Sequence, residues 1–268
     1  MIRTSQAPSL RSAPTAPLRR TAMSALAALV CVLGACAPLG AADAAGPTPY
    51  PDAQDEKAWP GVGPIRLFGW MVDNRKWFWT QRQAGHGAVV FIGDSLTGNW
   101  DGKQMAALFP GMKIANRGIG GDVTRGVLFR LQEDALDLDP KALVVLIGSN
   151  DLSAHADPAG VIANIAAIIA KARQHDAAMP IVLCTIAPRN SAKAPTKPGA
   201  HADLNARIAA FAADQQHLAL LDLVPVLGTG TDAPTPANYA DDQLHLAPAG
   251  YERWAAALHP LFHKLGVE

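Results

Sequence analysis

The sequence predicts an α/β fold, a three-layer α/β/α sandwich around a central five-stranded parallel sheet. Short apolar runs bounded by turn residues recur five times along the chain, as buried strands do. Stretches with helical periodicity lie between these runs. Alternating strands and helices are typical of a parallel sheet covered on both faces. The 268 residues are 49% hydrophobic, so the chain can bury the core that such a sandwich requires.

The expected elements can be placed by residue number. Five strands are predicted at Ala88–Gly93, Met112–Ala115, Ala142–Gly148, Pro180–Ile186 and His217–Leu223. Helices are predicted at Asp122–Glu133, Asp157–His175, His201–Gln215 and Ala247–Leu265. A further helix is predicted at Arg66–Gln83, and it contains Trp70, Trp77, Phe78 and Trp79. We expect these aromatic residues to pack in the core, with a sugar-stacking platform as the alternative.

Charge and cysteine content exclude several classes of protein. Lys plus Arg and Asp plus Glu both number 23, and no run of like charges occurs, so we expect no nucleic-acid partner. The three cysteines, at positions 31, 36 and 184, are too few for a disulfide framework. No Cys and His residues show zinc spacing. Cys184 lies inside a predicted strand and is interpreted as a buried apolar residue.

The N-terminal region has the features of an export signal. The first 20 residues contain four arginines and no acidic residue, and the apolar stretch Ala22–Gly34 follows them. This stretch is shorter than the ~20 residues of a spanning helix, which favours a cleaved signal over a permanent anchor. We therefore expect an export signal at residues 1–36, a flexible arm rich in Ala, Pro and Gly at 37–63, and a catalytic domain at 64–268.

Two modes of signal cleavage compete. Leu33-Gly34-Ala35-Cys36 resembles a bacterial lipobox, in which Cys36 would be acylated and would tether the chain to a membrane. Ala42-Asp43-Ala44 offers a cleavage site between small residues instead. Either mode predicts an exported bacterial protein, which is periplasmic in one case and a membrane-anchored lipoprotein in the other.

Polar residues follow the first two predicted strands, at the sheet edge where ligands bind. Gly93-Asp94-Ser95 places a serine on a sharp turn, where its hydroxyl is exposed. The Gly-x-Ser-x-Gly elbow is not matched, because position 97 is Thr. The glycine-rich stretch 116–122 offers backbone N–H groups to an anion. It lacks the spacing of a dinucleotide fingerprint, so nucleotide binding is not expected.

Later segments add an amide and an imidazole. The third strand leads into Gly148-Ser149-Asn150-Asp151. Asp242 precedes His245 by three residues, so its carboxylate can accept a hydrogen bond from one ring nitrogen while the other faces outward. Asp241 is a rival for that position. A metal site on Asp242 and His245 would lack a third ligand nearby in the sequence.

These four blocks, in this order, resemble those of the SGNH or GDSL hydrolase family: the Ser of GDS, a Gly, the Asn of GxND, and DxxH. The stretch Asn116–Leu131 (NRGIGGDVTRGVLFRL), Ala187-Pro188-Arg189 and Leu244-His245-Leu246 are similar to the platelet-activating-factor acetylhydrolase (isoform Ib) catalytic subunits and their bacterial relatives. The resemblance covers about Ala88 to Phe262. It implies the flavodoxin-like SGNH hydrolase fold, and the dimeric acetylhydrolase relatives imply a homodimer.

The resemblance assigns roles by position. It makes Ser95 the nucleophile, His245 the base and Asp242 the residue that orients the base. The backbone N–H groups of Ser95 and Gly121, with the Asn150 side chain, would form the oxyanion hole. The residues implied to border the acyl group are Leu96, Ser149 and Leu244. In the acetylhydrolase relatives these positions keep the pocket short, which suggests acetyl or other small acyl groups.

The expected activity is that of a serine esterase, which acts through an acyl-enzyme and requires no metal or organic cofactor. Its substrate would be a small-molecule, glycan or lipid ester. The alternatives are an O-acyltransferase acting on an extracytoplasmic glycan, a lipase or lysophospholipase for longer chains, and a binding protein that keeps the fold without catalysis. The segment Arg189–Ala200 borders the cleft and either selects the alcohol half or is an ordinary surface loop.

Overall fold

The computed structural model describes residues 46–229 and 233–268, and it contains the predicted three-layer sandwich. All five strands are parallel and lie in the order β2-β1-β3-β4-β5. The strands are β1 Val89–Gly93, β2 Ile114–Gly118, β3 Ala142–Leu146, β4 Ile181–Cys184 and β5 Leu218–Leu221. The α/β prediction and the five strands are therefore confirmed.

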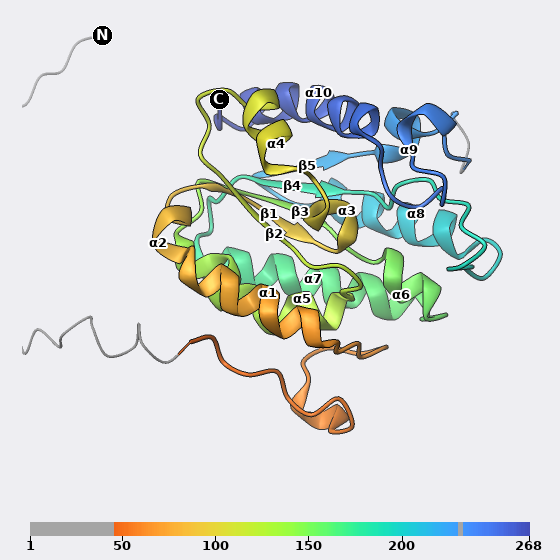
Figure 1. Cartoon of the computed structure of the whole chain (residues 1–268), viewed down its shortest axis with the longest axis horizontal. Helices are drawn as coiled ribbons and strands as arrows, with labels where there is room; N and C mark the ends of the chain where they lie inside the picture. Colours follow the sequence, from red (N-terminus) through yellow and green to blue (C-terminus); the bar gives the residue numbers. More distant parts are fainter. Residues whose placement is uncertain (1–45, 230–232) are drawn as a thin grey trace, which may run out of the picture. The chain divides into compact units, whose positions relative to one another are not determined.

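Helices cover both faces of the sheet (Figure 1). One face is covered by α1 Gly69–Thr80, α5 Thr124–Asp134, α7 Pro158–His175 and α8 Ala200–Ala213. The other face is covered by α4 Gly102–Leu108, α9 Leu223–Leu227 and α10 Pro248–Lys264. Side chains of β1 alternate between the two cores: Val90 and Ile92 join the first, Val89 and Phe91 the second.

The remaining elements are short. They are α2 Arg82–Gly85, α3 Ser95–Gly98 and α6 Ser149–Ser153, with 3-10 helices at η1 Glu56–Ala58, η2 Leu136–Leu138 and η3 Pro236–Asn238. None of them spans enough residues to show a helical period, so the sequence pattern did not reveal them. The same holds for α4 and α9. The predicted helix at 66–83 is divided into α1 and α2.

Strand β2 continues three residues beyond its predicted end, through Gly118. The polar side chains at its end find partners. The Asn116 amide donates to the carbonyl of Thr97 and its oxygen accepts from the N–H of Gly118. The Arg117 guanidinium lies over the ring of Phe78, 4.9 Å from its centroid. Because partnered polar groups are tolerated in a strand, the apolar pattern placed the strand end too early.

The expectation that the aromatic residues before β1 pack in the core is wrong for two of them. The buried face of α1 carries Met71, Arg75 and Phe78, which have the spacing of one helical stripe. Trp70 and Trp77 lie off this stripe and are 52% and 56% exposed.

The expected flexible arm at 37–63 differs from the structure from residue 46 onward. Trp59 is buried and stacks on Tyr50 with ring centroids 5.6 Å apart. The buried Arg125 of α5 donates to the carbonyl oxygens of Glu56, Trp59, Pro60 and Gly63. This stretch is thus packed against α5 through aromatic rings and backbone carbonyls, which leave no periodic signal in the sequence.

The expected export signal at 1–36, the acylation of Cys36 and the alternative cleavage site at 42–44 lie outside the described residues. Within the described part of the chain, no helix combines the length and the apolar character needed to cross a membrane.

Candidate active site

The site is built where β1, β2 and β3 end side by side. Gly93, at the end of β1, is paired with Gly118 of β2 and Leu146 of β3. A Cβ at Gly93 would lie 2.1 Å from the carbonyl oxygen of Leu146, so only glycine fits this close approach. Asp94 then caps α3 by accepting the N–H of Leu96 at 2.9 Å, and this turn presents Ser95 as the first residue of the helix.

His245 connects Ser95 with Asp242. Its Nε2 lies 3.0 Å from Ser95 Oγ, and its Nδ1 lies 2.6 Å from Asp242 Oδ2. The other carboxylate oxygen of Asp242 accepts the N–H groups of Leu244 and His245 at 3.0 and 2.9 Å. Of the carboxylates that the structure describes, only that of Asp242 lies within ion-pair distance of the His245 ring, so Asp241 does not take this place.

The contacts of Asp242 favour its ionised form. Partial burial acts to raise the pKa of this carboxyl group, but the backbone N–H and ring of His245 and the N–H of Leu244 outweigh burial and lower the pKa below its ordinary value. A carboxylate held in this way fixes the Nδ1–H tautomer of the imidazole, which leaves Nε2 free to accept a proton from Ser95.

The glycine-rich turn after β2 and the start of α6 contain the other predicted site residues, Gly121 and Asn150. Gly121 has a φ of +85°, the left-handed conformation that favours glycine, in the turn after β2. A Cβ at the neighbouring Gly120 would lie 3.9 Å from the Cβ of Ser95, so the turn lies beside the serine. Asn150, in α6, donates to the carbonyl of Asp122 at 2.9 Å. The structure thus places the turn that contains Gly121 beside Ser95 and links Asn150 to the end of that turn.

The predicted acyl-pocket residues differ in exposure. Leu96 and Ser149 are buried, and Leu244 is half-buried. Leu96 packs within the core beneath α10, while the Arg189 guanidinium donates to both the hydroxyl and the carbonyl oxygen of Ser149, at 2.5 and 2.9 Å. Leu96 is thus fixed by core packing, and the polar groups of Ser149 are covered by Arg189.

A buried ionic network supports the strand ends. Arg130 is fully buried and donates to the carbonyls of Gly93 and Arg117, at 3.0 and 2.8 Å, and to the carboxylate of Asp122 at 2.8 Å. It therefore joins the strand that leads to the serine to the turn that contains Gly121. Burial raises the pKa of Asp94 to about 7, although the N–H of Leu96 favours the carboxylate.

Arg66 and Phe68 were not predicted as site residues, and Trp70 was expected in the core, with a sugar-stacking platform as the alternative. Arg66 donates to the side-chain oxygen of Asn150 at 3.1 Å. The indole N–H of Trp70 donates to the carbonyl of Gly120 at 2.9 Å, and the ring of Phe68 stacks on that indole. The aromatic character of this segment was visible in the sequence, but nothing in its spacing indicated that it crosses the glycine-rich turn.

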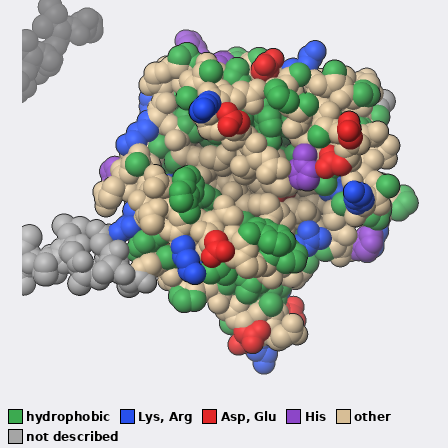
Figure 2. Space-filling model, viewed as in Figure 1, with side chains coloured by type: hydrophobic (Ala, Val, Ile, Leu, Met, Phe, Trp, Pro, Cys, Tyr) green, Lys and Arg blue, Asp and Glu red, His purple; other side chains and the backbone are tan. Residues whose placement is uncertain are grey.

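The site is open to solvent. Side chains of His245 and Asp242 are 34% and 37% exposed. Figure 2 shows a hollow on this face of the molecule, over β1 and α3, bordered by hydrophobic side chains and by a histidine with charged neighbours. A hollow of about 400 Å³ beside Asp242 is lined by Asn190–Lys193, so the predicted segment Arg189–Ala200 does border the site.

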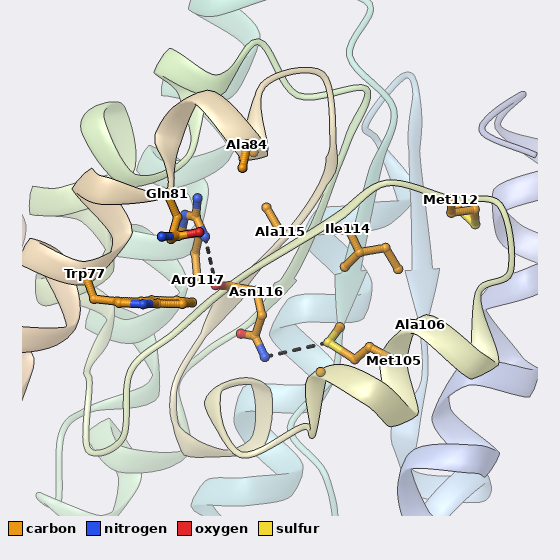
Figure 3. Close-up of a pocket in the computed structure, with 12 residues that line it drawn as sticks. Trp77, Gln81, Ala84, Met105, Ala106, Met112, Ile114, Ala115, Asn116 and Arg117 are labelled. Atoms are coloured by element: carbon orange, nitrogen blue, oxygen red, sulfur yellow. Dashed lines mark hydrogen bonds between the residues drawn. The ribbon is translucent and has the colours of Figure 1, made fainter. Parts of the chain in front are cut away.

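A second cavity lies apart from these residues. It has a volume of about 370 Å³ and follows the exposed edge of β2, between the α1–α2 region and α4 (Figure 3). Trp77, Met105 and Asn116 are among its lining residues, and Ser95 and His245 are not. Among the described residues, no cluster of three His, Cys, Asp or Glu side chains could hold a metal ion.

Comparison with known proteins identifies the family. The GDSL-like lipase/acylhydrolase family model matches residues 91–253. The chain belongs to the GDSL-like lipase/acylhydrolase family. Platelet-activating factor acetylhydrolase IB subunit alpha1 from Homo sapiens is 31% identical over 179 residues, covering 66% of this chain and 76% of that protein. The alpha2 subunit from Rattus norvegicus is 30% identical over 183 residues, with the same coverage.

Solved structures agree with this family in fold. A GDSL-like lipase from Bacteroides thetaiotaomicron superposes with a TM-score of 0.61 at 23% identity, covering 70% of this chain and 97% of that one. The resemblance found in the sequence is thus confirmed. As a GDSL-like acylhydrolase, the protein is a carboxylic ester hydrolase.

Proposed function

We propose that this hydrolase is a serine esterase that removes short acyl groups, above all acetyl, through an acyl-enzyme intermediate. The observation that carries the proposal is the continuous contact from Asp242 through His245 to Ser95, with distances of 2.6 and 3.0 Å. A serine hydroxyl is a weak nucleophile unless a base accepts its proton, and here the base is already within hydrogen-bond reach.

The geometry supports a two-step reaction. Ser95 Oγ attacks the ester carbonyl carbon while His245 Nε2 takes its proton, and Asp242 stabilises the imidazolium that forms. The N–H groups of Ser95 and Gly121 and the amide of Asn150 stabilise the oxyanion. As the intermediate collapses, His245 returns the proton to the departing alkoxide, leaving the acyl group on Ser95. Water then attacks this ester with His245 again as the base, and the carboxylic acid leaves.

The walls of the acyl pocket support a short acyl group. Leu96 is fixed in the core and Ser149 is covered by Arg189, so a long chain would have to displace packed side chains. The test is the hydrolysis rate of p-nitrophenyl esters from acetyl to decanoyl, for the wild type and for Ser95→Ala. We expect activity that depends on Ser95 and falls steeply beyond butyryl. Faster turnover of octanoyl than of acetyl esters would indicate a lipase instead.

Transfer of the acyl group to a sugar hydroxyl is the second candidate. It uses the same acyl-enzyme, and the exposure of His245 leaves space for an acceptor larger than water. Incubation with an acetyl donor and an acceptor sugar, followed by product analysis, separates the two reactions. Free acetate as the main product supports the esterase, and acetylated sugar supports the transferase.

We also propose that the enzyme is exported, which the arginines and apolar stretch of its first 34 residues support. Expression in a bacterium with labelled palmitate tests the mode of cleavage. Label that disappears in Cys36→Ala supports a lipoprotein, and an unlabelled mature chain beginning near residue 45 supports cleavage after Ala44.

A further inference from the structure

The large hydrophobic side chains that are exposed in the described part of the chain lie in one segment. They are Val62, Phe68, Trp70 and Trp77, with 53%, 40%, 52% and 56% of their surface exposed. Exposed apolar side chains that gather in one region indicate a binding surface rather than ordinary surface scatter. Two of the four, Phe68 and Trp70, border the glycine-rich turn beside Ser95, and we call this pair the aromatic shelf.

The aromatic shelf is held in place by contacts on its inner side. The rings of Phe68 and Trp70 are stacked, with centroids 4.4 Å apart and planes inclined by 13°. The indole N–H is bonded to the carbonyl of Gly120, so the ring cannot turn away without losing that bond. A Cβ at Gly121 would lie 3.5 Å from the Phe68 ring, which places this ring against the turn that supplies an oxyanion donor.

The shelf lies close to the reacting atoms. Gly120, to which Trp70 is bonded, is also the residue whose Cβ would lie 3.9 Å from the Cβ of Ser95. The proposed acyl walls come from α3, α6 and the loop before His245, so the segment ahead of α1 contributes to none of them. A group that extends from the ester over this segment is therefore the alcohol half of the substrate.

Arg66 adds a polar group next to the aromatic shelf. Its guanidinium donates one hydrogen bond to Asn150, and no carboxylate among the described residues forms an ion pair with it. Arg189 lies near enough that Arg66 helps to lower its pKa, after the larger effect of burial. The aromatic shelf is thus a flat apolar face that lies next to guanidinium donors.

We propose that the aromatic shelf binds the sugar ring of an O-acylated glycan, with the ring's C–H face on Phe68 and Trp70 and a hydroxyl group near Arg66. This inference rests on the proposed serine esterase and names its substrate class. The binding free energy of an alkyl chain depends on the apolar area that is removed from water, so an alkyl chain binds best in a site that encloses it. The aromatic shelf is open on one side and has polar donors next to it. This matches a sugar ring, which is apolar on its faces and polar around its edge.

The experiment compares two acetate esters, monoacetylated methyl β-xylopyranoside and ethyl acetate, by titrating the acid released. Both esters carry the same acyl group, so the ratio of their kcat/KM values reports recognition of the alcohol half. In Trp70→Ala and in Phe68→Ala we expect this ratio to fall about tenfold, mainly through the KM of the sugar ester. The matched control is Trp77→Ala, which removes an equally exposed indole from the same helix and should leave both substrates unaffected.

Binding provides a readout that does not depend on turnover. The Ser95→Ala variant can be titrated with the acetylated xyloside and followed by saturation-transfer NMR. We expect contacts from the ring protons of the sugar, and their loss when Trp70→Ala is added.

Each outcome bears on the inference. The inference is overturned if the ratio of kcat/KM for the xyloside to that for ethyl acetate is unchanged in both shelf variants, or if it falls equally in Trp77→Ala. It is also overturned if the shelf variants lose kcat/KM for decyl acetate, relative to ethyl acetate, but not for the xyloside, because the shelf then binds an alkyl chain. The proposed function fails separately, if Ser95→Ala retains the turnover of ethyl acetate.

Discussion

Arg66 and Asn150 are joined by a hydrogen bond of 3.1 Å from the guanidinium to the side-chain oxygen of the amide. The amide nitrogen of Asn150 donates to the carbonyl of Asp122 at 2.9 Å. With both ends of the amide held, the direction of its remaining N–H is fixed. The guanidinium also withdraws electron density from the amide oxygen, which makes that N–H a stronger donor.

Arg66 should therefore act as a positioning residue for the oxyanion hole. Loss of one hydrogen bond from a charged donor is worth about 1.5 kcal/mol, so we expect Arg66→Ala to lower kcat for ethyl acetate roughly tenfold with little change in KM. Arg66→Lys should restore part of the rate. A double-mutant cycle with Asn150→Ala checks the mechanism: if Arg66 acts through Asn150, adding Arg66→Ala to Asn150→Ala costs little more. Fully additive losses would show that the two act independently.

Asn150→Ala should itself have a large effect on the rate and a small one on folding. Removal of an oxyanion donor typically costs about 10² to 10³ in kcat. Asn150 is only half-buried, and its partners are a backbone carbonyl and the half-buried Arg66, so the melting temperature should change little. Steady-state kinetics and thermal unfolding of the same preparation provide the check. Unaltered turnover would remove Asn150 from the mechanism.

The two adjacent carboxylates before His245 should differ sharply. Asp242→Asn removes the charge that fixes the ring tautomer, and a comparable change in a serine triad lowers kcat by about 10⁴. Asp241→Asn changes a carboxylate outside ion-pair distance of the ring and should be much milder. Rates of p-nitrophenyl acetate hydrolysis by both variants decide between them. The opposite order of activity would shift the assignment by one residue.

The sequence predicted the features of the fold and the site that depend on a hydrophobic pattern or on a short motif. Alternating apolar runs predicted the parallel sheet, because buried strands and their covering helices need continuous apolar faces. Ser95 and His245 lie 150 residues apart, and it was the resemblance to the SGNH family that paired them as nucleophile and base.

Arg66, and the contact of Trp70 with the glycine-rich turn, were missed because such contacts leave no sequence signature. Arg66 and Trp70 bind an amide oxygen and a backbone carbonyl, and such partners can be supplied by any residue. Arg125 likewise holds the stretch before residue 63 through carbonyl groups. Trp77 was expected in the core because hydrophobicity alone does not tell which face of a short helix is covered.

The buried Asp94 should make the stability of the enzyme depend on pH. Asp94 is 1% exposed, and burial raises the pKa of its carboxyl group from 3.8 to about 7. Between these two values the folded state holds a proton that the unfolded state has released, so stability falls as the pH rises through this window. Below it both states are protonated, and above it the full cost of burying the charge is present. Asp242, whose pKa is lowered, acts in the opposite sense and only in more acidic solution.

Asp94→Asn isolates this contribution. The asparagine oxygen can still accept the N–H of Leu96 that caps α3, but the side chain does not titrate. Between about pH 5 and about pH 8 we expect the wild type to lose about 2 to 3 kcal/mol of unfolding free energy relative to the variant. Urea denaturation of both proteins across this range gives the difference directly, and Asp151, whose pKa is raised to about 6, contributes equally to both. Parallel stability curves would show that Asp94 is ionised throughout this range.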